Sequence, residues 1–390
     1  MIPYGRQDIS EADIQAVVEV LKSDFLTQGP TVPNFEKAVA DYCEVKYPFA
    51  VNSATSALHI ACLALGVGKG DLVWTSPITF VASANCALYC GADVDFVDID
   101  VLTYNMSVSV LEDKLIKAEK EGRLPKVVIP VHLAGQSCEM DKIYALGQIY
   151  GFRIIEDASH AIGGKYKNKA IGGCQYSDIT VFSFHPVKII TTGEGGMCTT
   201  NDAQLAISLN RFRSHGIVRQ PSEMTHVPDG PWYYQQVELG YNYRMTDIQA
   251  ALGLSQMKRI DDFVKARHAI FERYNELLNE DWLELPWQHD DTYSALHLYI
   301  VRIKKNNKGI THRQLFEKLR NAGVLVNLHY IPVYRHPYYE IKEYDINAFP
   351  NAEAYYSQAI SLPIFPSLTE SEQLFVIDTI KKPLGHQNLF

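Results

Sequence analysis

The stretch from Ser183 to Gly196 places one lysine, Lys188, among hydroxyl groups, glycines and a carboxylate. An apolar run, Ile179 to Phe182, leads into it, and a second strand-like run, Met197 to Thr200, follows it. A lysine in such a setting can form a Schiff base with a carbonyl cofactor. The alternative is a solvated loop lysine beside a glycine turn, and the stretch alone does not decide between the two.

A carboxylate with suitable placement lies upstream. Asp157 follows the apolar run Arg153 to Ile155 and sits at the expected end of a strand. A carboxylate in a mostly buried site can keep a pyridinium protonated, which makes the ring of a cofactor such as pyridoxal phosphate an electron sink. The competing interpretation of Asp157 is a helix N-cap. His160 and His185 could also contact a cofactor, although a lone histidine is more often structural.

Candidates for an anion cradle and a ring contact occur earlier in the chain. Ala54, Thr55 and Ser56 open an expected helix, where backbone amides and hydroxyls can bind a phosphate, and Ser183 adds another hydroxyl. Phe80, shortly after a strand, could stack on a flat ring. Plain helix capping and ordinary core packing are the alternatives for these residues.

The elements that must position these residues alternate along the first half of the chain. Short apolar strands alternate with helical segments, which predicts an α/β fold with a mostly parallel sheet covered by helices on both faces. Ligands of such sheets bind beyond the carboxyl ends of the strands, where the candidate residues fall. Strand-like runs are expected at residues 49–51, 72–75, 94–97, 127–131 and 153–155, and helices from about residues 10, 32, 55, 79 and 140.

The second half differs in character. A long irregular loop spans Gly216 to Gly240, and one long helix is expected from Asp247 to about Asn279, bridging two domains. A smaller α+β unit follows. We therefore expect a large cofactor-binding domain over residues 1–245, whose N-terminal segment could pack on the small domain, and a small C-terminal domain over residues 246–390 that includes the bridging helix.

Composition narrows the class of protein. The chain has 390 residues, 47% of them apolar, and a net charge of −9 without a basic cluster, which argues against nucleic acid or an anionic membrane as a partner. No signal peptide or membrane-spanning run is visible. The seven cysteines form no Cys-x-x-Cys pair, as expected for reduced thiols in a cytoplasmic protein. No metal motif, dinucleotide fingerprint or Gly-x-Ser-x-Gly elbow is present.

The order of these motifs resembles the DegT/StrS-type nucleotide-sugar aminotransferases over nearly the whole chain. The most specific match is Ser183 to Gly196. Supporting matches are Asn52 to Thr55, Glu156-Asp157, Arg213 to Gly216, Gly240 to Arg244 and Ser361 to Pro366. The resemblance implies a fold-type-I transferase dependent on pyridoxal phosphate, with a seven-stranded sheet.

The resemblance also implies roles for individual residues. Lys188 would hold pyridoxal 5′-phosphate covalently and shuttle a proton, with pyridoxamine 5′-phosphate formed in the half reaction. Asp157 would pair with the pyridine nitrogen, and Phe80 would stack on the ring. The phosphate would be bound by the segment at Ala54, by Thr55, Ser56 and Ser183, and by Asn242 of the neighbouring subunit, which implies a homodimer with shared sites. His160 stands where relatives often have Gln, and Ala54 replaces a frequent Gly.

Within the family, three segments look closest to the pseudaminic-acid-pathway branch: Ile2 to Gln7, Gly230 to Tyr234 and His329 to Pro332. Those enzymes transfer an amino group, by family analogy from L-glutamate, to C4 of a UDP-linked 4-keto-6-deoxy-N-acetyl-hexosamine of L-arabino configuration. The candidate substrate residues are Tyr4, Arg6, His185, Trp232, Tyr234, His329 and Tyr330.

Other functions stay open at this point. The same family includes enzymes for other dTDP-, GDP- or UDP-linked keto-sugars, aminated at C3 or C4. A pyridoxal phosphate sugar dehydratase would carry His in place of Lys188, and a non-catalytic sugar-binding relative would be expected to lose Lys188 or Asp157. The sequence determines neither the stereochemistry of the sugar nor the destination of the product.

Overall fold

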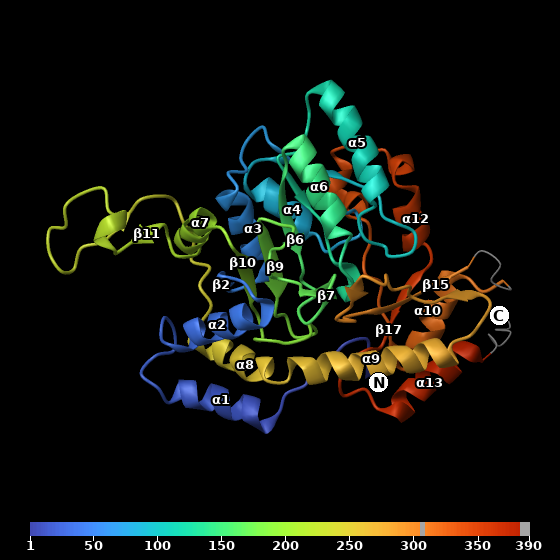
Figure 1. The fold of residues 1–390 in the computed structure, drawn as a ribbon. Helices are drawn as coiled ribbons and strands as arrows, with labels where there is room; N and C mark the ends of the chain where they lie inside the picture. Colours follow the sequence, from blue (N-terminus) through green and yellow to red (C-terminus); the bar gives the residue numbers. More distant parts are fainter. Residues whose placement is uncertain (305–308, 383–390) are drawn as a thin grey trace.

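A seven-stranded sheet forms the centre of the computed structural model, which describes residues 1–304 and 309–382 (Figure 1). The strand order is β2-β10-β9-β6-β5-β3-β4. β10 runs antiparallel to both of its neighbours, whereas the other neighbouring pairs are parallel, so the sheet is mixed. The strands are β2 (Tyr47–Val51), β3 (Leu72–Thr75), β4 (Asp93–Phe96), β5 (Val127–Ile129), β6 (Arg153–Asp157), β9 (Ile179–Ser183) and β10 (Gly196–Thr200).

Helices cover both faces of this sheet. α3 (Ala54–Ala64), α4 (Ala82–Tyr89) and α7 (Ala203–Arg213) pack on one face, around a core that includes Ile155. α5 (Val108–Glu121) and α6 (Met140–Tyr150) pack on the other face, around a core that includes Ile154. Successive strand residues point to opposite faces, which is why the neighbours Ile154 and Ile155 belong to different cores.

Local sequence signals begin and end several of these helices. Ser53, Ser107 and Asp202 are N-caps whose side chains accept hydrogen bonds from the first turns of α3, α5 and α7. Gly122 and Gly151 end α5 and α6 in the left-handed conformation that glycine adopts readily. The helix predicted from about residue 140 is α6, and Gly151 accounts for its end at Tyr150.

The expected single helix from Asp247 to about Asn279 is wrong. The chain forms two helices, α8 (Asp247–Met257) and α9 (Ile260–Leu277), which run end to end along one side of the molecule (Figure 1). Between them Arg259 leaves helical geometry, with φ −118° and ψ 8°. Its guanidinium forms ion pairs with Asp8 and Asp13, at 2.8 and 2.6 Å, and so joins the break to the N-terminal segment. α1 (Glu11–Leu21) packs along α8, and α2 (Thr31–Cys43) packs on its other side.

A second core lies in the C-terminal part. The antiparallel sheet of β13 (Leu283–Glu284), β15 (Tyr299–Ile303) and β17 (Ala359–Leu362) packs with α9, α10 (His312–Asn321) and α13 (Glu370–Lys381). The N-terminal strand β1 (Ile2–Pro3) pairs in parallel with β16 (Val324–Leu325), so the chain's start joins this part.

One C-terminal segment returns to the central sheet. Tyr334, Tyr339 and Phe349 pack around Phe96 of the edge strand β4. These residues flank or lie in α11 (Pro337–Glu340), and α12 (Pro350–Tyr356) follows them. A small sheet of β14 (Thr292–Tyr293), β7 (Lys165–Tyr166) and β8 (Lys169–Ala170) adds another connection between the two halves of the chain.

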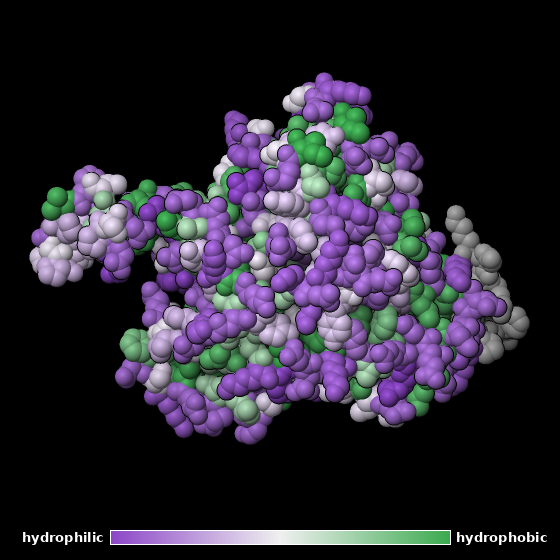
Figure 2. All heavy atoms as spheres, in the orientation of Figure 1, coloured by the Kyte–Doolittle hydropathy of each residue, from purple (hydrophilic) through white to green (hydrophobic). Residues whose placement is uncertain are grey.

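The predicted irregular loop projects from the body as an arm, defined here as residues 217–240 (Figure 1). Its base is the two-stranded ribbon of β11 (Ile217–Val218) and β12 (Gln235–Gln236). Val227, Trp232 and Leu239 are 87%, 74% and 76% exposed, and Figure 2 shows the arm standing clear of the remaining surface. Across the described residues, no helix combines the length and apolar character needed to cross a membrane.

Candidate active site

A cavity of about 870 Å³ lies beyond the carboxyl ends of β2, β3, β6 and β9. It brings together most of the residues that the sequence singles out, although they come from distant segments. The predicted residues that line it are Tyr4, Ala54, Thr55, Ser56, Phe80, Asp157, His160, Ser183, His185, Lys188, His329 and Tyr330.

Lys188 is presented to this cavity by a tightly bonded loop between β9 and β10. The amide of Lys188 donates to the carbonyl of His185 at 2.9 Å, and Thr191 Oγ1 donates to the carbonyl of Phe184 at 3.0 Å. Ile189 and Ile190 are buried and anchor the loop in the core. The hydroxyls and glycines that follow Lys188 thus mainly build the loop, which leaves the lysine side chain directed to the cavity.

The ammonium group of Lys188 forms no hydrogen bond or ion pair within residues 1–304 and 309–382. Burial lowers the pKa of Lys188 to about 8, and the negative charge of Asp157 opposes part of that shift. A primary amine with this pKa is partly neutral near physiological pH and can act as a nucleophile or base.

Asp157 is held in a fixed position at the end of β6. Its Oδ1 accepts hydrogen bonds from the amide and the hydroxyl of Ser159, at 3.1 and 2.6 Å, and its Oδ2 accepts one from Ser83 Oγ at 2.6 Å. The side chain is 4% exposed and lines the cavity. These hydrogen bonds satisfy both carboxylate oxygens in a buried position. Asp157 is not a helix N-cap, because the next element after β6 is the strand β7.

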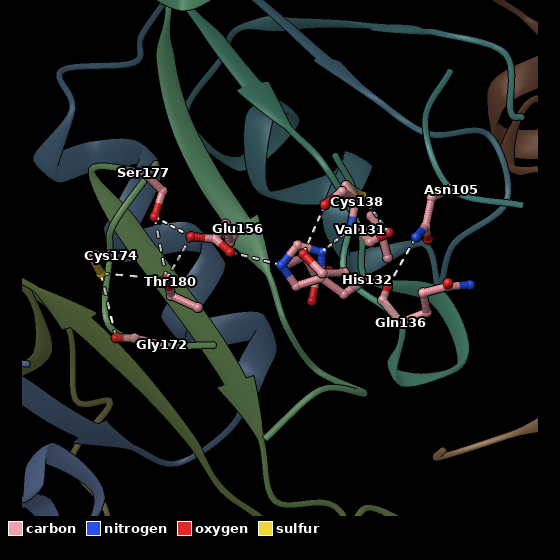
Figure 3. A network of polar contacts seen from close by, with 12 residues as sticks. Asn105, Val131, His132, Gln136, Cys138, Glu156, Gly172, Cys174, Ser177 and Thr180 are labelled. Carbon is pink, nitrogen blue, oxygen red and sulfur yellow. Dashed lines mark hydrogen bonds and ion pairs between the residues drawn. The ribbon is translucent and has the colours of Figure 1, made fainter. Parts of the chain in front are cut away.

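Glu156, the preceding residue, points to the opposite side of the sheet and belongs to a buried network (Figure 3). His132 Nδ1 accepts a hydrogen bond from the amide of Cys138 at 3.1 Å, so its Nε2 carries the proton and donates to Glu156 at 2.8 Å. Ser177 and Thr180 also donate to Glu156. Burial raises the pKa of Glu156, but these donors outweigh burial and hold it below its usual range. This network stabilises β6 next to Asp157.

The start of α3 forms an anion cradle at the cavity. The amides of Ala54 and Thr55 lie in the first helical turn, where no intrahelical acceptor is available. Gly196 permits the close approach of β10, since a Cβ there would lie 2.6 Å from the nitrogen of Ala54. The hydroxyl of Ser56 donates to Asn52 Oδ1 at 2.7 Å, so its proton is already engaged, whereas Thr55 and Ser183 can direct theirs to a ligand.

Three aromatic or imidazole side chains form one wall. His160 Nδ1 accepts from the amide of Ala134 at 3.3 Å, and its Nε2 lies 3.0 Å from Tyr330 Oη. The ring of Phe80, 59% exposed, is tilted against Tyr330 at 6.2 Å. Burial lowers the pKa of His160 far below its usual value, with a further contribution from Lys188, so this imidazole is neutral at physiological pH.

His329 and Tyr4 form the neighbouring wall, with ring centroids 4.8 Å apart. His329 Nδ1 lies 2.8 Å from Ser361 Oγ. Burial, together with Lys188, lowers the pKa of His329 to about 3, so it offers hydrogen bonds rather than a positive charge.

Four predicted residues do not line this cavity. Trp232 and Tyr234 belong to the arm, where Tyr234 packs against the guanidinium of Arg219 at 5.2 Å. Asn242 is exposed at the base of the arm, and Arg6 is exposed near the chain's start. A single chain therefore does not bring these four residues to the cavity.

Several further lining residues had no individual role predicted from the sequence: Asn52, Ser53, Thr79, Ser83, Ser159 and Glu194. Asn52, Ser53 and Glu194 lie within the motifs Asn52 to Thr55 and Ser183 to Gly196, Ser159 lies between Asp157 and His160, and Thr79 precedes Phe80, so the positions of these five follow from the sequence pattern. Ser83 carries no such signal, because its approach to Asp157 depends on how α4 packs against β6. The described residues contain no cluster of three His, Cys, Asp or Glu side chains suited to a metal ion.

Several known proteins with similar sequences and structures are aminotransferases. The chain matches the DegT/DnrJ/EryC1/StrS aminotransferase family over residues 7–381. It is 39% identical to the spore coat polysaccharide biosynthesis protein SpsC of Bacillus subtilis, with 97% of this chain and 96% of the relative covered. It is 38% identical to the UDP-4-amino-4,6-dideoxy-N-acetyl-beta-L-altrosamine transaminase of Campylobacter jejuni, with the same coverage. Helicobacter pylori PseC, an aminotransferase involved in the biosynthesis of pseudoaminic acid, superposes with a TM-score of 0.88 at 31% identity, covering 97% of this chain and 98% of PseC.

The cavity fits the cofactor of this family, pyridoxal phosphate, which relatives contain in PLP-form and PMP-form structures. An amine with a lowered pKa is available for its aldehyde, a buried carboxyl group for its ring nitrogen, and an open helix start for its phosphate. By sequence and by structure, the chain belongs to the DegT/DnrJ/EryC1/StrS aminotransferase family and is a nucleotide-sugar aminotransferase dependent on pyridoxal phosphate.

Proposed function

We propose that this enzyme transfers the amino group of L-glutamate to the C4 keto group of a UDP-linked 4-keto-6-deoxy-N-acetyl-hexosamine, in pseudaminic acid biosynthesis. The observation that carries the proposal is the joint presence of Lys188 and Asp157 in one cavity, in a chain whose full length resembles a transaminase named for such a sugar. The match to PseC supports the same pathway.

Lys188 and Asp157 would have different roles in the reaction. Bound pyridoxal phosphate supplies an electron sink and carries the amino group between donor and acceptor. Lys188 would hold the cofactor and, once released, take up and return the proton at the reacting carbon, a role that its pKa of about 8 suits. Asp157, held in place by three hydrogen bonds, would pair with the ring nitrogen and stabilise positive charge there.

The remaining lining residues would bind and orient. The first turn of α3, with Thr55 and Ser183, would bind the phosphate, and Phe80 would lie against the cofactor ring. The hydroxyl of Ser56 donates to Asn52, so it would not donate to the phosphate, and Ser56 would take part through its place in the first turn of α3. His160, His185, Tyr4, His329 and Tyr330 would contact the cofactor or the sugar as neutral hydrogen-bonding groups.

A homodimer with shared active sites is part of the proposal. Apart from histidines, Lys188 is the one basic side chain among the residues that line the cavity, where Asp157 and Glu194 are acidic. A nucleotide diphosphate and a glutamate bring further negative charge, so a single chain leaves these anions poorly compensated. A second copy that placed its arm and Asn242 at this cavity would supply the missing contacts, including Trp232 and Tyr234. The free cysteines suit a reducing, cytoplasmic location.

We also propose that the chain divides into a large domain over residues 1–245 and a small domain over residues 246–390. The hydrophobic core that β15 forms with α9, α10 and α13 supports this division. Leu298, Tyr334 and other residues of the C-terminal part join the core of the central sheet and connect the two domains. The pairing of β1 with β16 makes the N-terminal segment part of the small domain's packing.

The decisive test of the substrate is an assay with purified enzyme and a set of UDP- and dTDP-linked 4-keto sugars, followed by determination of the configuration at the aminated carbon. Amination at C4 of the UDP-linked L-arabino sugar would support the proposal. Transfer only to a dTDP sugar, or at C3, would instead support the alternative substrate, another nucleotide-linked keto-sugar. SpsC, which is 39% identical to this chain, is named for spore coat polysaccharide biosynthesis and not for the pseudaminic acid pathway.

A further inference from the structure

Three buried side chains form a hydrogen-bonded row in the wall of the cavity. Thr79 Oγ1 lies 2.7 Å from Ser83 Oγ, and Ser83 Oγ lies 2.6 Å from Asp157 Oδ2. Thr79, Ser83 and Asp157 are 2%, 1% and 4% exposed, and all three line the cavity. Thr79 and Ser83 come from the start of the α4 region, whereas Asp157 ends β6.

The chemistry of the three groups fixes the direction of the row. An ionised carboxylate only accepts hydrogen bonds, so Ser83 donates its hydroxyl proton to Asp157. A hydroxyl has one proton to give, and Ser83 must therefore accept from Thr79. The further contact from Ser83 to the carbonyl of Phe80 is long, at 3.4 Å, and does not compete.

The two oxygens of Asp157 are thereby held from opposite sides. Oδ1 is bonded by Ser159 of its own loop, and Oδ2 is bonded by Ser83 of α4. Ser159 moves with β6, so it cannot by itself fix the carboxylate relative to the α4 wall that carries Phe80. Ser83 provides that link. Oδ1 already accepts two hydrogen bonds from Ser159, whereas Oδ2 accepts only the one from Ser83 and keeps a lone pair for a ligand.

We infer that Ser83, aligned by Thr79, is a positioning residue that sets the orientation of Asp157 toward the ring nitrogen of the cofactor. The inference rests on the proposed role of Asp157 and adds two residues to it. Ser83 acts through Asp157 and touches neither the amino donor nor the sugar. The loss of its hydroxyl should weaken the hold on the cofactor ring and slow turnover, while sugar binding changes little.

The test compares Ser83→Ala, Thr79→Val and the double variant with the wild type. One hydrogen bond to a charged group corresponds to roughly tenfold or more in an equilibrium constant. We expect Ser83→Ala to weaken pyridoxal phosphate binding to the apo protein about tenfold, lower kcat about tenfold and shift the pH midpoint of the bound cofactor's visible absorption, with KM for the sugar within about twofold.

The double variant tests whether Thr79 acts on Asp157 through Ser83 or whether each side chain has a separate effect on packing. Thr79→Val keeps the shape of the side chain and removes only its hydroxyl, and we expect a loss of about twofold to threefold in cofactor affinity. In the Ser83→Ala background the same change should have no further effect, because its partner is gone. Ser137→Ala, another buried serine bonded at the carbonyl of Cys138, serves as the control and should match the wild type.

The outcomes separate this inference from the proposed function. A wild-type protein that takes up no pyridoxal phosphate would contradict the assigned role of the whole cavity. A wild type that binds it, with Ser83→Ala unchanged in cofactor affinity, absorption and kcat, would overturn only the role of Ser83. If Ser83→Ala does not fold, an unchanged Thr79→Val would overturn the inference.

Discussion

His160 Nε2 and Tyr330 Oη lie 3.0 Å apart, although they belong to opposite halves of the chain. The amide of Ala134 donates to His160 Nδ1, so Nε2 carries the proton and donates to the Tyr330 oxygen. The hydroxyl proton of Tyr330 is therefore free to point into the cavity. This arrangement makes Tyr330 a hydrogen-bond donor to a ligand, while its oxygen accepts a hydrogen bond from the neutral His160.

Removing that donor tests its contribution. We expect Tyr330→Phe to lower kcat/KM for the sugar about tenfold, since one neutral hydrogen bond is lost and the ring remains. Tyr338→Phe, at a tyrosine 67% exposed to solvent, is the matched control and should behave as the wild type. Steady-state kinetics measure both, and equal values for the two variants would remove Tyr330 from the ligand contacts.

The pKa of Lys188 predicts how the apo protein takes up its cofactor. Only the neutral amine attacks an aldehyde, so the rate of uptake should rise about tenfold per pH unit below pH 8 and level off above it. The negative charge of Asp157 raises the pKa of Lys188, hence Asp157→Asn should move the midpoint to lower pH. Stopped-flow absorbance follows the reaction, and a wild-type midpoint near that of an ordinary lysine would contradict the buried environment.

Lys188 itself is tested by truncation. We expect Lys188→Ala to yield a colourless protein without covalently held cofactor and to reduce turnover on the order of a thousandfold, because both nucleophile and proton carrier are lost. The exposed Lys169→Ala on β8 is the control and should remain yellow and active. Absorption spectra and mass spectrometry after borohydride reduction provide the measurement. Cofactor still attached to Lys188→Ala would locate the covalent site elsewhere.

Mixing two inactive variants tests whether subunits share a site. Asn242→Asp should repel a phosphate in the partner's cavity, and Lys188→Ala disables its own cavity. In mixed dimers one site would carry both changes and the other neither, so activity should return to roughly a quarter of the wild type after subunit exchange. Each variant alone sets the baseline. No recovery, despite exchange shown by mass spectrometry, would mean that Asn242 serves its own chain.

The buried network at Glu156 predicts a large effect on stability. His132→Ala removes the donor at 2.8 Å and leaves a buried carboxylate with fewer partners, so the free energy of unfolding should fall by about 3 kcal/mol. His226→Ala on the exposed arm should change it by less than about 0.5 kcal/mol. Urea denaturation followed by circular dichroism measures the difference. Equal stability of the two variants would show that Glu156 finds other donors.

Local sequence determined the elements and much of the cofactor site. The alternation of apolar strands with helices, and the hydroxyl and glycine pattern around Lys188, depend on neighbours in the chain, and they indicated the residues that follow β2, β6 and β9. Those strand ends converge at one edge of the sheet, so their positions along the chain were sufficient to predict one shared cavity.

Only the tertiary structure decided relationships between distant segments. The break between α8 and α9 arises at Arg259, whose partners Asp8 and Asp13 lie far away in sequence and leave no local signal. The approach of Ser83 to Asp157 and of Tyr330 to His160 likewise results from packing of helices and loops against the sheet. Trp232 and Tyr234 lie outside their own chain's cavity because the arm extends away from the body, whereas Asn242 lies at the base of the arm and does not line the cavity.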